Sequence, residues 1–182
     1  NFGTITSDDV GSASISSTLN YSCTNTGTTP GYVSVCLAAD GGDKPSAVIP
    51  RYMKTAPSNR ELAFNMTLSN GGIWGTRSAG VGVEYNSGPI YIPARLNPSN
   101  PSTISGKETI NTSLLSSNTQ AIPGTYNNIF NGGHTAMTIS TSTFQNFSNC
   151  LTGSQGTVRF PFTVQATVLP SCKVTAKPNI DL

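Results

Sequence analysis

The chain has 182 residues, of which only 10% are charged, and its formal net charge is +2. This charge is too small, and the Lys and Arg residues are too scattered, for a nucleic-acid-binding surface. No apolar run approaches the ~18 residues that a membrane span needs. The 23 Ser, 24 Thr, 17 Asn and 18 Gly favour short strands joined by turns over helices.

Alternation of apolar and polar residues predicts a series of strands. In chain order they are Ser14–Cys23, Tyr32–Ala39, Glu61–Leu68, Pro89–Leu96, Thr135–Ser142 and Val158–Leu169, the last being the longest. Only Thr112–Thr119 is a candidate for a helical turn. Short strands at intervals of ~8–12 residues with turns between them predict an all-β sandwich or barrel.

The four cysteines indicate two disulfides formed in an oxidising compartment. Three connectivities are possible. A turn-rich stretch joins the strands that carry Cys23 and Cys36, and a hairpin there would place these two residues opposite each other. We therefore expect a Cys23–Cys36 bond. Cys150 and Cys172 then remain as the second pair, unless Cys172 pairs with a cysteine outside this chain.

Eight short motifs lie in order along the chain. They are Asn1–Ile5, Tyr21–Asn25, Val35–Leu37, Pro50–Met53, Leu62–Met66, Ile73–Gly75, Ile122–Tyr126 and Phe162–Ala166. This ordered set resembles the spore-coat protein U-like domain of archaic (Csu-type) chaperone–usher pili. The resemblance implies an immunoglobulin-like antiparallel β-sandwich, and we expect long loops at one pole of it.

The C-terminal segment resembles the first strand of a second such domain. The resemblance therefore implies an N-terminal adhesin domain over residues 1–169, with Val158–Leu169 as its own last strand. Residues 170–182 would form a linker and the opening strand of a pilin-like domain.

Two-domain subunits of this family act at the pilus tip, so the resemblance implies an extracellular protein that is exported through the periplasm and supports biofilm formation. Its implied partners are an abiotic or host surface, the pilin domain of the same subunit and, through that domain, a periplasmic chaperone and the next pilus subunit. Two departures from the family favour binding over simple polymerisation: the chain shows no Cys-containing strand before Asn1, and it has extra residues around Asn127–His134.

Catalytic and metal-binding patterns are weak in this sequence. His134 is the single histidine, no serine lies in a GxSxG motif, and no cysteine pair has metal-ligand spacing. No phosphate or dinucleotide motif is present either. We expect no enzymatic activity, no metal and no cofactor.

The best functional signal is a set of apolar residues within loop-like segments rich in Gly, Asn and Pro. The segments are Pro45–Pro50, Ala79–Val83 and Asn127–Gly133, and the candidate surface-binding residues are Val48, Ile49, Val81, Val83, Ile129 and Phe130. If these segments cluster, their side chains would make a non-directional contact with an apolar surface. Two alternatives are a structural pilin domain that polymerises by donor-strand complementation and a lectin-like adhesin that uses Trp74, Tyr85 and Asn86.

Overall fold

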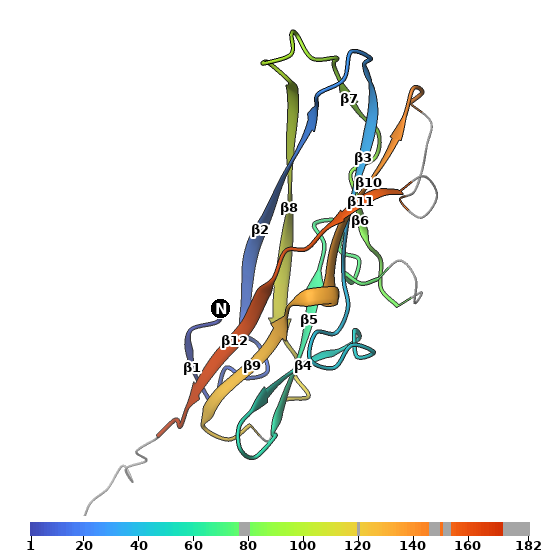
Figure 1. The fold of residues 1–182 in the computed structure, drawn as a ribbon. Helices are drawn as coiled ribbons and strands as arrows, with labels where there is room; N and C mark the ends of the chain where they lie inside the picture. The colour runs from blue at the N-terminus through green and yellow to red at the C-terminus, as the bar shows by residue number, and fades with distance from the viewer. Residues whose placement is uncertain (77–80, 120, 146–149, 151–153, 173–182) are drawn as a thin grey trace, which may run out of the picture.

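The computed structural model describes residues 1–76, 81–119, 121–145, 150 and 154–172. Two β-sheets make up the fold, which confirms the predicted immunoglobulin-like sandwich (Figure 1). The seven-stranded sheet has the order β1-β12-β9-β4-β5-β8-β2. Its strands are β1 (Thr4–Thr6), β2 (Ser14–Asn25), β4 (Arg51–Thr55), β5 (Glu61–Thr67), β8 (Ser102–Leu114), β9 (Gly124–Phe130) and β12 (Phe162–Leu169).

The second sheet is built around β3 (Gly31–Ala39). One edge of β3 pairs with β10 (Thr135–Ser142), which in turn pairs with β11 (Ser154–Val158). The short strands β6 (Tyr85–Asn86) and β7 (Ile90–Ile92) both pair with β3 along its other edge. A 3₁₀ turn, η1 (Gly132–His134), joins β9 to β10.

Four of the predicted strands are present with nearly the predicted bounds. β10 has the predicted bounds, and β2, β3 and β5 differ from the predicted strands only at their ends. In β5, Leu62, Phe64 and Met66 are all buried, and Leu68 continues this inward face just past the strand. The turn at Gly71 follows directly, with a φ of 87° that favours glycine.

Three predictions of local structure were wrong. The strand Val158–Leu169 is two strands, because β11 ends at Val158 in one sheet and β12 begins at Phe162 in the other. The helical turn expected over Thr112–Thr119 is instead the end of β8 followed by a turn, in which the Asn118 N–H donates to the Leu115 carbonyl. The strand expected over Pro89–Leu96 is reduced to β7.

Aromatic side chains fill the space between the sheets. The Trp74 indole is 1% exposed, lies stacked 6.0 Å from the Phe162 ring and donates from Nε1 to the Leu37 carbonyl. Phe162 also stacks on Phe130, with ring centroids 4.5 Å apart. β12 lies between β9 and the parallel strand β1. A strand of this chain therefore fills the position between β1 and β9 in the sheet.

The expected second-domain segment, residues 170–182, lies mostly outside the described part of the chain. Among the described residues, no helix is long and apolar enough to cross a membrane.

Candidate functional site

Three segments that are distant in sequence lie together beside Asp40. The Asp40 N–H donates to the His134 carbonyl at 3.0 Å, and the Asp40 carboxylate contacts His134 Nδ1 at 2.9 Å. The neighbouring Ala39 N–H donates to the Gly75 carbonyl at 3.3 Å. The Gly75 and Thr76 N–H groups donate in turn to the carbonyls of Val83 and Val81. Residues 40–50, residues 75–76 with 81–83, and residues 129–134 therefore lie beside one another, and we call this region the three-loop surface.

Arg51 lies beneath the three-loop surface and hydrogen-bonds to its backbone at Asp40. Its side chain is fully buried, and it donates from Nε to the Asp40 carbonyl at 2.8 Å and from Nη2 to the Ala39 carbonyl at 2.9 Å. Burial lowers the pKa of Arg51 to about 10, and the nearby Asp40 carboxylate opposes that shift. The guanidinium is therefore still charged at neutral pH, and it fixes the two carbonyls at which β3 ends.

Asn128 joins the first and third segments. Its Nδ2 donates to the carbonyls of Gly41 and Tyr52, both at 2.9 Å, and its Oδ1 accepts from the Asp43 N–H at 2.9 Å. The Asp43 carboxylate in turn accepts from the Ile129 N–H at 3.0 Å. One buried amide thus holds the 40–43 turn against β9.

Replacing Asn128 by Ala is expected to lower the free energy of unfolding by about 2–3 kcal/mol, because two carbonyls and one N–H lose their partner. Asn127→Ala is the matched control, since this neighbouring side chain is only half-buried on the other face of β9. Urea unfolding of both variants measures the difference. Equal losses in the two variants would contradict the role assigned to Asn128.

The six predicted surface-binding residues divide between surface and core. Ile49, Val83 and Ile129 are exposed by 56%, 48% and 44%, and Val81 is half-buried. Val48 and Phe130, in contrast, are 2% and 0% exposed. The expectation that these two side chains reach the surface was therefore wrong.

Phe130 is buried because the segment Asn127–Gly133 is not a loop. Its first four residues belong to β9, which pairs with β12 from Gly124 to Phe130. Successive side chains of a strand point to opposite faces, so Tyr126, Asn128 and Phe130 point inward while Asn127 and Ile129 point outward. Ile129 is thus exposed on a strand rather than at a loop tip.

The predicted disulfide pairing was also wrong. The structure has a Cys36–Cys150 bond, and both cysteines are fully buried. β2, which carries Cys23, pairs with β8 in the seven-stranded sheet, so it forms no hairpin with β3. Cys23 is a half-buried free thiol whose pKa is raised by burial, and Cys172 is exposed and free.

The structure does not support the lectin-like alternative, in which Trp74, Tyr85 and Asn86 would form a sugar-binding site. Trp74 is buried, as described above, and Tyr85 donates to or accepts from the Tyr21 hydroxyl at 2.9 Å. Asn86 Oδ1 accepts from the Ser34 hydroxyl at 2.6 Å and from the Gly88 N–H at 2.9 Å. These groups already have partners within the fold, so they do not form an open sugar site.

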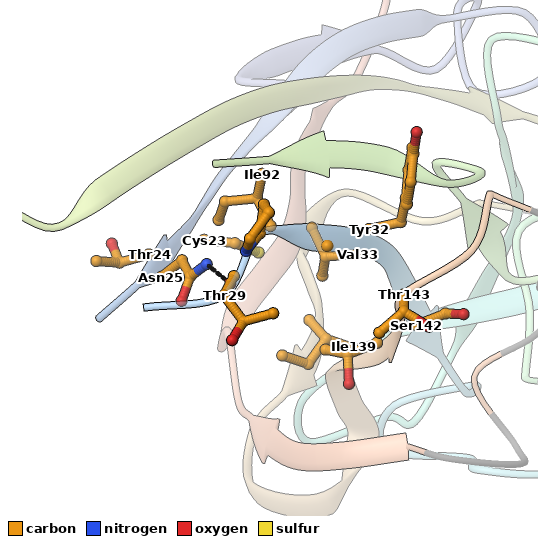
Figure 2. Close-up of a pocket in the computed structure, with 13 residues that line it drawn as sticks. Cys23, Thr24, Asn25, Thr29, Tyr32, Val33, Ile92, Ile139, Ser142 and Thr143 are labelled. Atoms are coloured by element: carbon orange, nitrogen blue, oxygen red, sulfur yellow. Dashed lines mark hydrogen bonds between the residues drawn. The ribbon is translucent and has the colours of Figure 1, made fainter. Parts of the chain in front are cut away.

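A hollow that sequence reasoning missed lies between the sheets at the C-terminal end of β2 (Figure 2). Its volume is about 480 Å³. Val33, Ile92 and Ile139 supply its apolar part, and hydroxyl groups such as those of Thr29 and Ser142 border it. No lining side chain is charged, so the hollow suits an uncharged group. Its residues come from β2, β3, β7 and β10 and from the segments that follow β2 and β10, and no local sequence pattern connects them.

Within the described ranges, no three His, Cys, Asp or Glu side chains are grouped closely enough to hold a metal ion.

Comparison with known proteins gives a distant structural similarity. No family model and no curated protein sequence matches the chain. One similar solved structure is the crystal structure of the CsuC–CsuE chaperone–tip adhesion subunit pre-assembly complex from the archaic chaperone–usher Csu pili of Acinetobacter baumannii. Its sequence identity is 15% and its TM-score 0.45, and the match covers 98% of this chain and 62% of that one. This chain thus spans less than two thirds of the chain that it matches.

Proposed function

We propose that this chain is the adhesion domain of a chaperone–usher-type pilus subunit and that it attaches to apolar surfaces through the three-loop surface. The observation that carries this proposal is that three segments joined at Asp40 each present an exposed aliphatic side chain: Ile49, Val83 and Ile129. The ordered sequence motifs support assignment to the pilus system.

The chain as a whole is poor in charge, which favours apolar contacts. Asp40, Asp43 and Lys44 nevertheless lie within the three-loop surface, so the contact has to leave these groups in water. Each of the three side chains is about half exposed, so covering it contributes roughly 1 kcal/mol. Together they supply about 3 kcal/mol, which is roughly two orders of magnitude in affinity. Many pili acting at once would multiply this weak contact by avidity and support biofilm formation.

The proposed context is an extracellular position at the pilus tip, reached through the periplasm. Residues 1–169 would be the adhesin domain, and residues 170–182 would lead into a pilin-like domain that meets the chaperone and the next subunit. The place of β12 between β1 and β9 supports a domain that completes its own sheet. The same observation argues against the alternative of a pilin domain that requires a donor strand from another subunit.

The test compares two sets of exposed apolar residues for attachment to polystyrene and to hydroxylated glass. Ile49→Ser, Val83→Ser and Ile129→Ser in one chain should weaken binding to polystyrene at least tenfold. The matched control is Tyr91→Ser, Leu96→Ser and Phe144→Ser, whose side chains are 52%, 81% and 70% exposed elsewhere on the molecule. The control should bind within about twofold of the unchanged chain. Equal losses would refute the three-loop surface as the site, and no loss in either would refute apolar attachment.

A further inference from the structure

β2 is a long edge strand without the devices that normally prevent strand pairing between proteins. It spans 12 residues at the end of the seven-stranded sheet and pairs with β8 through 12 consecutive residue pairs, without a bulge. Its sequence, SISSTLNYSCTN, has no charged residue and no proline. Natural edge strands are usually protected by charge, proline, bulges or shortness.

The other sheet edges have such protection. β1 has three residues and is followed by Asp8 and Asp9. β7 has three residues between Pro89 and Pro93. β6 has two residues, and β11 has five and is followed by Arg159. β2 therefore differs from every other edge in the described part of the chain.

β2 is also accessible. Figure 1 shows β2 and β8 extending together past the rest of their sheet, in which β2 is the edge strand. Three hollows adjoin β2. One is lined by Ile15, Ser17 and Leu19, and one by Cys23–Asn25. The third is lined by Ser22–Thr24 together with Thr157 and Val158 at the end of β11. No backbone hydrogen bond in the described structure ties β2 to an element other than β8.

We propose that β2 pairs with β2 of a second copy of this chain, antiparallel and about a two-fold axis perpendicular to the sheet. Directly opposite residues in an antiparallel pair lie on the same face of the sheet. The residue numbers of each facing pair must therefore add up to an even total. One such register places Asn20 on the axis, Thr18 opposite Ser22 and Ser16 opposite Thr24.

This register faces hydroxyl with hydroxyl and amide with amide, which are the kinds of side chain that already hydrogen-bond between β2 and β8. Between β2 and β8, the Ser16 hydroxyl donates to Asn111 Oδ1 at 2.6 Å, and the hydroxyls of Thr24 and Thr103 lie 3.1 Å apart. Across the two-fold axis, Asn20 would face Asn20, and the hydroxyls of Thr18 and Ser16 would face those of Ser22 and Thr24. Such cross-strand pairs stabilise a sheet.

Charge favours a second copy over a charged partner strand. β2 is neutral, so two copies of it meet without repulsion. On the neighbouring strand β8, the exposed Lys107 pairs with Asn20. Two Lys107 residues across the axis would be about 14 Å apart, at three strand spacings of about 4.8 Å. That separation exceeds the Debye length of about 8 Å at physiological salt.

The expected association is weak. Twelve residues at about 3.4 Å give an edge about 41 Å long, and with a sheet thickness of about 10 Å each copy buries about 400 Å². The total of about 800 Å² is below the standard range for stable complexes. We therefore expect a dissociation constant between about 10 µM and 1 mM.

The experiment measures self-association by sedimentation equilibrium from about 10 to 500 µM. Thr18→Lys with Ser22→Lys should weaken dimerisation at least tenfold, because four lysines meet at the seam. Thr18→Glu with Ser22→Glu should do the same, and mixing the Lys and Glu variants should restore a heterodimer. The matched control is Ser105→Lys with Thr109→Lys, which carries the charges on the β8 residues that face Ser22 and Thr18. It should dimerise within about threefold of the unchanged chain.

Hydrogen exchange provides a second measurement. Amides of β2 that point away from β8 should exchange more slowly at high protein concentration. A monomer at 500 µM, or association that the β2 lysines leave unchanged, would overturn the proposal. A complex with another protein that these lysines abolish, without any self-association, would also overturn it, because the occupant would then be a foreign strand.

Discussion

Removing the Cys36–Cys150 disulfide is expected to lower the free energy of unfolding by about 4–5 kcal/mol. The bond joins residues separated by 114 positions. Opening a loop of this length returns a large conformational entropy to the unfolded chain, which accounts for an effect of this size. For a domain of this length the melting temperature should fall by about 10–20 °C.

The measurement is denaturant unfolding of a chain carrying Cys36→Ala and Cys150→Ala. Both side chains are fully buried and small, so alanine leaves only a minor packing defect in addition to the lost bond. Cys23→Ala is the matched control, because this half-buried cysteine is free, and it should cost no more than about 1 kcal/mol. A double variant within 1 kcal/mol of the unchanged chain would contradict the prediction. So would an equal loss from Cys23→Ala, which would point to the predicted Cys23–Cys36 pairing instead.

The strands that sequence reasoning found are those in which the inward residues are apolar. β5 is the clearest, because Leu62, Phe64 and Met66 alternate with less buried neighbours along one face. β8, the longest strand, was missed for the opposite reason. Its inward positions include Gly106, Glu108 and Thr112, which carry no hydrophobic signal.

The inward residues of β8 nevertheless make specific tertiary contacts. The Glu108 carboxylate is buried and accepts from the Ser69 N–H at 2.7 Å. A side chain at Gly106 would collide with the Tyr21 ring, which occupies the space that the glycine leaves. Tertiary partners therefore determine these residues, and no pattern within the strand itself predicts them.

Phe130, one of the two buried residues of the predicted apolar site, was misplaced for the same reason. A buried polar residue, Asn128, interrupts the apolar alternation of β9, so the segment resembled an exposed loop. The predicted cysteine pairing was wrong because of the strand topology. It assumed that two strands adjacent in sequence form a hairpin. β2 and β3 belong to different sheets, and their partners, β8 and β10, begin more than 70 residues further along the chain.

Phe130→Ala is expected to cost about 3–5 kcal/mol of stability, whereas Ile129→Ala should cost about 1 kcal/mol or less. Phe130 is fully buried and stacks on Phe162, so truncation leaves a cavity beside the Phe162 ring. Ile129 is 44% exposed and faces outward from the same strand.

Both Ile129 and Phe130 are predicted from the sequence to take part in surface binding. In the structure, Ile129 is available for surface contact, whereas Phe130 packs in the core. Attachment to polystyrene should respond to Ile129→Ala but not to Phe130→Ala, when binding is measured under conditions where both variants remain folded. Unfolding by urea should show the reverse order. If Phe130→Ala left stability unchanged and reduced attachment, Phe130 would lie at the surface, and the assignment of Asn127–Phe130 to a strand of the seven-stranded sheet would be wrong. If neither variant reduced attachment, Ile129 would be excluded from the contact, and Ile49 and Val83 alone would have to supply it.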